Sequence, residues 1–282
     1  MRIDLHTHSN FSDGTDRPSE LINKALSQGI TTLALTDHDT IAGWDEARKW
    51  LRPGLDLVLG SEISCQTEDG ISVHMLGLLF DPNYQPLQDV LAQTRDNRIG
   101  RMGRIIARMN EAGIDISLDE VHAQLSDGAT LGRPHLADAL VAKGLAKSRD
   151  EVFADWLANN SPFYVPHYSP TPEEVIRLIK GAGGVAVIAH PLASLRGRVV
   201  SLESFDSYIE AGLDGIEVKH RDQTLEQQQL LFEVAAKADL AKTGSSDYHG
   251  TGKMNELGEF TTDPQEWKKL EARADARRVI RL

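Results

Sequence analysis

Short apolar runs alternate with amphipathic stretches along most of this chain. The runs are rich in Val, Ile and Leu and are bounded by Gly, Thr or Asp, which is typical of buried strands. One amphipathic stretch begins with Pro18 and ends with Gly29, residues that favour the start and the end of a helix. The predicted helices include 18–29, 40–51, 171–183 and 223–238, and the predicted strands are 2–6, 31–37, 55–64, 71–80, 183–191, 214–220 and 240–247.

The order of these elements predicts the fold class. Strands that alternate with helices of this length form βα units and a parallel sheet. The turn at 66–70 joins two successive strands and indicates a hairpin within that sheet. The tail at 266–282 has the pattern of a charged helix followed by a short strand. We therefore expect an α/β barrel.

The middle of the chain differs because it shows no convincing strand between about residues 84 and 164. We interpret 84–164 as a helical insertion that contributes to the substrate pocket. The barrel domain then comprises 1–83 and 165–282. The predicted helices of the insertion lie at 90–113, 117–126, 133–144 and 149–159.

Composition narrows the class of protein. The longest apolar runs of the 282 residues are too short to span a bilayer, and no signal-peptide pattern opens the chain. The single cysteine, Cys65, excludes an intramolecular disulfide and fits a reducing compartment, so we expect a cytoplasmic protein with no membrane partner. A net charge of -12 argues against binding duplex DNA, which needs a basic face.

Histidines and carboxylates gather at the ends of the apolar runs. His6 and His8 are two residues apart, so on an extended strand both imidazoles lie on one face. In α/β barrels the active site forms at the C-terminal ends of the strands. Imidazole and carboxylate groups suit Zn, Mn and Fe, so the pattern predicts one multinuclear metal site. The candidate ligands are His6, His8, Asp13, His38, Glu62, His74, His190, Asp247 and His249.

A family resemblance is carried by the segments HTHSNFSDG, LTDHD, GSEIS, HMLGLLF, AHP and SSDYHG. They resemble the polymerase and histidinol phosphatase (PHP) family of the amidohydrolase superfamily. The segments LGRPHLADALV and GIEVKHRDQT resemble one branch, the 3',5'-nucleotide bisphosphate phosphatases and the related exoribonuclease RNase AM. The resemblance covers nearly the whole chain. It implies a distorted (β/α)7 TIM-like barrel with a trinuclear metal site at its mouth.

The same resemblance divides the ligands among three divalent ions. We expect these ions to be Mn, with Fe or Zn as alternatives. Glu62 then bridges two of the ions. Together with Asp247 and His220 it is expected to act in catalysis. The resemblance assigns His6, His8, Glu62 and Asp247 to the first ion, Glu62 with His74 and His190 to the second, and Asp13, His38 and His249 to the third.

Five further residues are candidates for binding the substrate. Arg133 and His135 stand at a predicted helix start, where an anion is favoured, although a structural role in the loop is the alternative. His220 follows a barrel strand and either contacts the substrate or supports a ligand. Arg196 and Arg198 lie in a predicted loop near the mouth, where a solvated basic loop is equally expected.

These features together predict hydrolysis of a phosphate ester. Paired ions hold phosphate oxygens and generate hydroxide from bound water near neutral pH. The leading hypothesis is removal of the 3'-phosphate from a nucleoside 3',5'-bisphosphate such as pAp, with short 5'-phosphorylated single-stranded RNA as a second substrate. One alternative is a histidinol-phosphate-type phosphomonoesterase. Another is a non-catalytic PHP module of a replication assembly, which ranks last because the sequence shows no polymerase segment.

Overall fold

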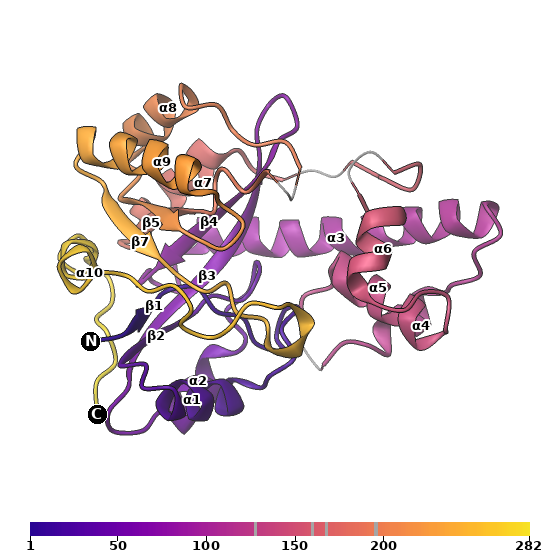
Figure 1. The fold of residues 1–282 in the computed structure, drawn as a ribbon, viewed down its shortest axis with the longest axis horizontal. Helices are drawn as coiled ribbons and strands as arrows, with labels where there is room; N and C mark the ends of the chain where they lie inside the picture. The colour runs from indigo at the N-terminus through magenta and orange to yellow at the C-terminus, as the bar shows by residue number, and fades with distance from the viewer. Residues whose placement is uncertain (127–128, 159–160, 167–168, 195–196) are drawn as a thin grey trace.

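The computed structural model describes residues 1–126, 129–158, 161–166, 169–194 and 197–282. Within these ranges seven strands form one sheet in chain order (Figure 1). Neighbouring strands are parallel except β4, which is antiparallel to both of its neighbours. The strands are β1 (Ile3–Asp4), β2 (Thr32–Leu35), β3 (Asp56–Gln66), β4 (Ser72–Leu78), β5 (Val185–Ala189), β6 (Gly215–Lys219) and β7 (Ala241–Gly244).

The sheet curls into a nearly closed barrel. Thr7, just after β1, forms a parallel bridge with Tyr248, just after β7, and the backbone N–H of His8 donates to the Tyr248 carbonyl at 2.9 Å. The predicted hairpin at 66–70 is present as the turn between β3 and β4. The fold is therefore α/β, a distorted seven-stranded TIM-like barrel, as the sequence predicts.

Successive side chains along each strand point to opposite faces of the sheet and so contribute to two different hydrophobic cores. Val185 and Val187 of β5 belong to an inner cluster together with Trp267 of the C-terminal helix, whereas Ala186 and Ile188 face the outer helices. The sequence of a strand that is buried on both faces is a continuous apolar run, and residues 185–189 form such a run. The helices of the barrel are α1 (Pro18–Ser27), α2 (Trp44–Trp50), α7 (Pro172–Gly181), α8 (Ser204–Ala211), α9 (Leu225–Lys237) and α10 (Pro264–Glu271).

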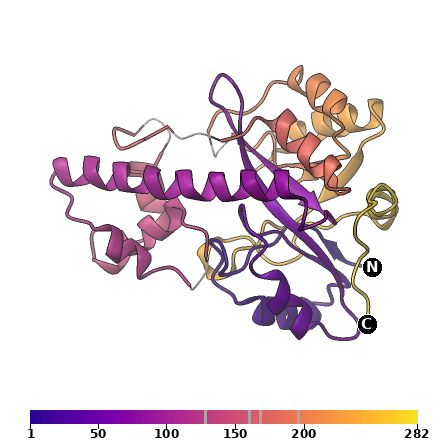
Figure 2. The ribbon, with the colours of Figure 1, turned by 180° about the vertical axis from the view of Figure 1, so that it is seen from behind.

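The segment between β4 and β5 projects to one side of the barrel (Figure 1). Its first helix, α3, runs from the barrel far into the projection (Figure 2). Leu87 and Leu91 of α3 pack in the outer core of the barrel, whereas Ile105 and Met109 belong to a separate core within the projection. One helix thus joins two cores. The helices of this segment are α3 (Gln85–Glu111), α4 (Leu118–His122), α5 (Arg133–Ala142) and α6 (Arg149–Asp155).

Some details differ from the sequence-based expectations. Helix α8 was not predicted, and β3 ends two residues beyond the predicted strand 55–64, while α4 and α6 end earlier than predicted. Strand β3 continues to Gln66 because it pairs with β4 along seven residues, which the apolar pattern did not reveal. No helix among the described residues is long and apolar enough to cross a membrane.

Candidate metal centre

All nine candidate ligands meet at one end of the barrel. His6, His38, His190 and Asp247 follow β1, β2, β5 and β7, while Glu62 lies in β3. Every potential ligand atom within a group lies within 4.8 Å of the others, and the groups share members. The four groups are His8, Asp13, His38 and His249; His6, His8, Glu62 and Asp247; His6, His190 and Glu217; and His38, Glu62 and His74.

The backbone turns two of these ligands inward. His190 and Asp247 have positive φ angles of 32° and 51°, in the left-handed region of the backbone that non-glycine residues rarely adopt. Such strain persists only where the surrounding structure enforces it, and it is concentrated at functional sites. The backbone N–H of His190 donates to Oε2 of Glu217 at 2.9 Å, which helps to hold the turn.

The group of His6, His8, Glu62 and Asp247 has the spacing of ligands around one ion. The Nε2 atoms of His6 and His8 are 3.1 Å apart, and each lies 3.1–3.2 Å from Glu62 Oε2 and 3.3 Å from Asp247 Oδ1. Two atoms bound to an ion at ~2.1 Å lie roughly 3.0–3.4 Å apart in octahedral or tetrahedral geometry. The observed distances match that range, so this donor set fits a divalent ion.

Unsatisfied polar atoms support the same conclusion. Glu62 Oε2, Asp13 Oδ1 and His249 Nε2 are buried and each lies 3.1 Å from another candidate ligand, but within the described part of the chain none of them makes a hydrogen bond of acceptable geometry. A buried polar atom without a hydrogen bond is costly, and more so when its group is charged. Bound cations would satisfy these atoms.

Glu62 lies at the centre of the cluster. Its Oε1 faces His74 Nδ1 at 2.8 Å and His190 Nε2 at 3.2 Å, while its Oε2 faces His38 Nδ1 at 3.1 Å as well as the first group. Burial by itself would raise the pKa of the Glu62 carboxyl, but His38, His74 and His6 hold that pKa well below its usual value. The carboxylate therefore stays ionised, with its two oxygens directed to different ligands.

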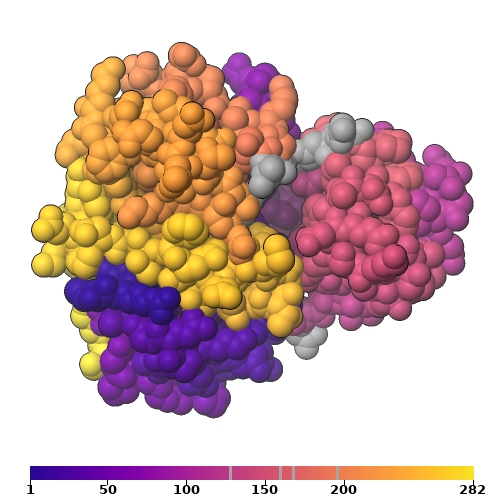
Figure 3. Space-filling model, viewed as in Figure 1, coloured from indigo at the N-terminus to yellow at the C-terminus, as the bar shows by residue number. Residues whose placement is uncertain are grey.

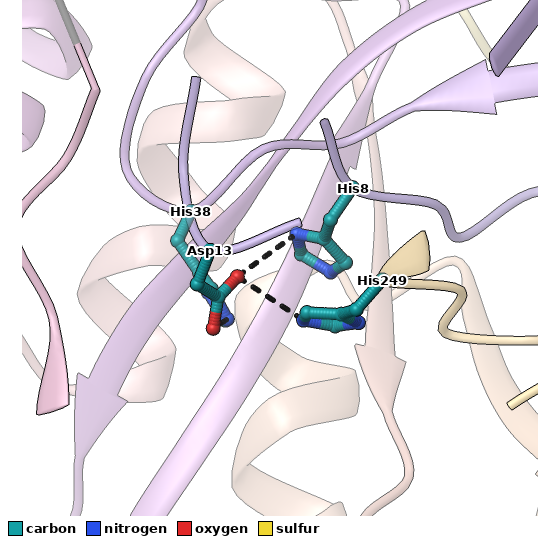
Figure 4. Close-up of side chains that lie close together, drawn as sticks. All are labelled: His8, Asp13, His38 and His249. Carbon is teal, nitrogen blue, oxygen red and sulfur yellow. Dashed lines mark ion pairs between the residues drawn. The ribbon is translucent and has the colours of Figure 1, made fainter. Parts of the chain in front are cut away.

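Asp13 lies among three of the histidines, His8, His38 and His249 (Figure 4). Its Oδ1 lies 3.1 Å from His249 Nε2 and 3.9 Å from His8 Nδ1, and its Oδ2 lies 3.8 Å from His38 Nε2. Burial, helped by the nearby Lys253 and His8, lowers the pKa of His249 to about 4. A histidine that stays neutral keeps a lone pair for a metal, so His249 suits this role.

Glu217 of β6 is a member of the cluster that the sequence analysis did not single out. It is fully buried, and its Oε1 lies 3.1 Å from His6 Nδ1, leaving His6 Nε2 directed toward the first group. A carboxylate on the second ring nitrogen fixes the tautomer and orientation of a ligand histidine. The signal in the sequence was a lone acidic residue inside the apolar strand GIEVK.

Glu217→Gln is expected to weaken metal binding by about ten- to hundredfold, because the amide orients His6 without the charge that makes the imidazole a stronger donor. The measurement is a titration of metal-free protein with Mn²⁺, followed calorimetrically. Unchanged affinity in a folded variant would show that Glu217 does not act through His6.

The candidate substrate residues are less uniformly placed. His220 is buried with its Nε2 3.6 Å from Asp247 Oδ2, so it reaches the cluster through Asp247. His135 is also buried, and its Nδ1 accepts a hydrogen bond from the Gly132 N–H at 3.1 Å. Arg198 is exposed and pairs with Asp69 in the turn between β3 and β4, outside the groups described above. Arg196 lies outside the described residues.

Arg133 begins α5 and belongs to a group of arginines. Its Nη1 donates to the Leu157 carbonyl at 2.7 Å, and its guanidinium lies over the Phe153 ring. Burial, opposed by Tyr164 and reinforced by Arg98, lowers the pKa of Arg133.

Two more members of this group come from α3. Arg98 donates to Asp39 Oδ2 at 2.7 Å, and the buried Arg101 has its pKa lowered to about 9 by burial and by Arg133. Repulsion between neighbouring guanidinium groups disfavours their charged forms, and a bound anion would relieve it. The signal in the sequence was an Arg at every third position of α3, at 95, 98, 101 and 104.

Comparison with known proteins places the chain in a family. Residues 4–159 match the PHP domain family. A 5'-3' exoribonuclease from Haemophilus influenzae is 36% identical over 259 residues, which cover 91% of this chain and 93% of that protein. A 3',5'-nucleoside bisphosphate phosphatase from Chromobacterium violaceum is 33% identical over 277 residues, covering 96% of this chain and 97% of that protein.

A solved structure agrees with these relatives. A candidate metal-dependent phosphoesterase from Bifidobacterium adolescentis superposes with a TM-score of 0.92 at 43% identity, covering 97% of this chain and 96% of that one. The family match spans more than half of the chain and the relatives span nearly all of it. On the strength of its barrel, its histidine–carboxylate cluster and these similarities, this chain belongs to the PHP domain family.

Proposed function

We propose that this chain is a metal-dependent phosphatase that removes the 3'-phosphate from nucleoside 3',5'-bisphosphates such as pAp, releasing AMP and phosphate. The observation that carries the proposal is the buried group of His6, His8, Glu62 and Asp247, whose neighbouring ligand atoms lie 3.1–3.3 Å apart. Divalent ions held by such a group supply an activated water and neutralise the charge of a transferred phosphoryl group. The bisphosphate phosphatase among the relatives supports the choice of substrate.

In this proposal the cluster would hold three divalent ions, with Mn preferred over Fe or Zn. Glu62 would be the residue shared by two of them, since its two oxygens face different histidines. Asp13, His38 and His249 would hold the third ion. His220 steadies Asp247, which it meets at 3.6 Å, and thereby keeps that carboxylate oriented in the first group.

The phosphate that is not cleaved needs a cationic partner away from the ions. Arg133 supplies it from the insertion at 84–164, and Arg98 and Arg101 add positive charge beside it. His135, whose Nδ1 accepts the Gly132 N–H in the first turn of α5, is the second group that would hold this phosphate. Arg196 and Arg198 remain candidates for contacts with a longer substrate.

Short 5'-phosphorylated RNA is a second substrate in this proposal. The bisphosphate and the RNA both present a 5'-phosphorylated nucleotide whose scissile bond is at the 3' oxygen. The exoribonuclease relative supports this reading.

A panel of three substrates tests the proposed function. Phosphate release from pAp and stepwise trimming of 5'-phosphorylated RNA are expected, each dependent on a divalent metal. Preference for histidinol phosphate would instead favour the phosphomonoesterase alternative. Failure to turn over any phosphate ester in the presence of Mn²⁺, by protein that binds the metal, would favour a non-catalytic module.

Arg133→Ala is expected to lower kcat/KM on pAp by about ten- to hundredfold and to change little on a nucleoside 3'-monophosphate. A charge-assisted hydrogen bond contributes about 1.5–3 kcal/mol, and about 1.4 kcal/mol corresponds to a factor of ten in rate. The 3'-monophosphate lacks the group that Arg133 contacts, so the loss is confined to pAp. Steady-state kinetics on both substrates measure it.

The matched control is Arg17→Ala, which removes an arginine paired with Glu46 on the barrel surface. It is expected to leave both substrates unaffected. Equal losses on both substrates in Arg133→Ala would assign Arg133 to the scissile phosphate or to the fold of the insertion.

A further inference from the structure

Arg149 of α6 joins the insertion to two loops of the metal centre. Its Nη1 donates to the backbone carbonyls of Asp13 and Gly252, each at 3.4 Å. The first carbonyl belongs to a candidate ligand, and the second lies three residues after another, His249. The Arg149 side chain is only 18% exposed although it comes from a different lobe of the molecule. One guanidinium thus spans the outer side of both loops.

The other edge of the same guanidinium is held within the insertion. Its Nε and Nη2 donate to the two carboxylate oxygens of Asp138 on α5. A bidentate arginine–carboxylate pair fixes the plane of the guanidinium as well as its position. The orientation in which the Arg149 guanidinium contacts the loops is therefore fixed, unlike that of a flexible surface cation.

Two more contacts connect the insertion to the loop that carries Asp13. The backbone N–H of Thr130 donates to the Phe11 carbonyl at 2.9 Å, and Asn10 Nδ2 donates to Ser126 Oγ at 3.0 Å. Figure 3 shows the insertion lobe resting against the yellow C-terminal part of the chain. The loop is thus held from the side of the insertion as well as from the barrel.

The two loops also contact each other directly. The Thr15 N–H donates to the His249 carbonyl at 3.1 Å, and the Thr251 N–H donates to Thr15 Oγ1 at 2.8 Å. Loss of Arg149 therefore loosens the pair of loops without separating them. Asp13 Oδ1 and His249 Nε2 are only 3.1 Å apart, a spacing that such loosening would change.

Gly252 leaves room for the guanidinium. A Cβ at this position would overlap with Arg149 Nη1, closer than real Cβ contacts allow. The displaced atom is at the far end of a side chain. An alanine at position 252 would therefore move the Arg149 guanidinium away without shifting the backbone.

We propose that Arg149, held by Asp138, is a positioning residue that fixes Asp13 and His249 relative to each other and so completes the ion site they share with His8 and His38. The helical insertion then has a second role besides contacting the substrate. The inference rests on the metal centre of the proposed function but not on the identity of its substrate.

Metal binding by the full-length protein tests this role without reference to activity. Metal-free wild-type protein and variants are titrated with Mn²⁺, and bound metal is counted after dialysis at fixed free Mn²⁺. Arg149→Ala is expected to weaken one binding step by about ten- to hundredfold, the usual effect of removing a partner that orients a ligand. The remaining steps keep their affinity, because the groups around Glu62 do not contact Arg149. Arg149→Lys is expected to restore little of the Mn²⁺ affinity. The lysine ammonium lacks the planar set of N–H donors with which the guanidinium binds Asp138 and both carbonyls at once.

Two further variants separate positioning from stability. Gly252→Ala is expected to weaken the same step, and adding it to Arg149→Ala is expected to cause no further loss, because the displaced group is already gone. The control is Lys143→Ala, which removes a cation that pairs with Asp115 and Glu120 inside the insertion. It is expected to leave every binding step unchanged.

Normal Mn²⁺ binding by both Arg149→Ala and Gly252→Ala would overturn this inference alone. Equal weakening in Lys143→Ala would also overturn it, since the effect would then follow the stability of the insertion. Wild-type protein that takes up no Mn²⁺ would overturn the metal centre and this inference together.

Discussion

Glu62→Gln is expected to lower turnover of pAp by roughly a thousandfold, about 4 kcal/mol at about 1.4 kcal/mol per factor of ten. The two oxygens of Glu62 face five imidazoles in total, and its pKa is held well below the usual value, so the site is built around an ionised carboxylate. Glutamine removes that charge and directs an NH₂ group at ring nitrogens that are also needed as ligands. In the proposed site two ions would lose a shared ligand at once, so this effect is expected to exceed that of any other single ligand.

Two measurements are needed to interpret the Glu62 variant: the rate on pAp and the metal content of the purified protein. Glu46→Gln is the matched control, because Glu46 pairs with the exposed Arg17 and belongs to none of the ligand groups. The control is expected to behave as wild type. Activity of Glu62→Gln within tenfold of wild type, with full metal content, would contradict a bridging role.

Removal of the metal with a chelator is expected to abolish activity, and Mn²⁺ is expected to restore it at least as well as Mg²⁺. The candidate ligands include six imidazoles, whereas Mg²⁺ prefers oxygen ligands and retained water. Buried atoms such as Glu62 Oε2, without a hydrogen-bond partner among the described residues, leave the metal-free cluster electrostatically unfavourable. Metal should therefore also stabilise the fold.

The thermal midpoint provides the second readout for chelation. A ligand at a hundred times its Kd stabilises a folded protein by about 2.7 kcal/mol, so Mn²⁺ is expected to raise the melting temperature of the metal-free protein. Addition of metal back to the chelated sample controls for irreversible damage. Reactivation by Mg²⁺ but not by Mn²⁺ would mean that the imidazole-rich groups do not hold the catalytic ions.

Much of the barrel could be predicted because strands and helices leave local patterns. The run at 185–189 and the amphipathic helix α7 are defined by neighbouring residues, and both were expected from the sequence. The α/β class and the existence of a helical segment between β4 and β5 followed from the same patterns. Helix α8, whose buried residues are Phe205, Tyr208 and Ala211, was not predicted.

The candidate ligands were proposed from short motifs, but their grouping was decided by the tertiary structure. The i, i+2 spacing of His6 and His8 is local. That His190 meets His6 and Glu217, and that His38 meets Glu62 beside His74, depends on the order of the strands and on the reversed direction of β4. The pairing of Glu217 with His6 spans 211 residues, and no local pattern encodes it.

The sequence by itself determined the alternation of strands and helices, the types of ligand and the net charge, because each depends on residues read within a short window. Only the tertiary structure decided which side chains share a site. Arg133 lies near enough to Arg98 and Arg101 to affect their charge, and Arg149 contacts the loops of Asp13 and His249. These contacts arise because α3 packs in both cores and so joins the insertion to the barrel. Contacts of this kind depend on how distant surfaces pack together, which the spacing of residues along the chain does not specify.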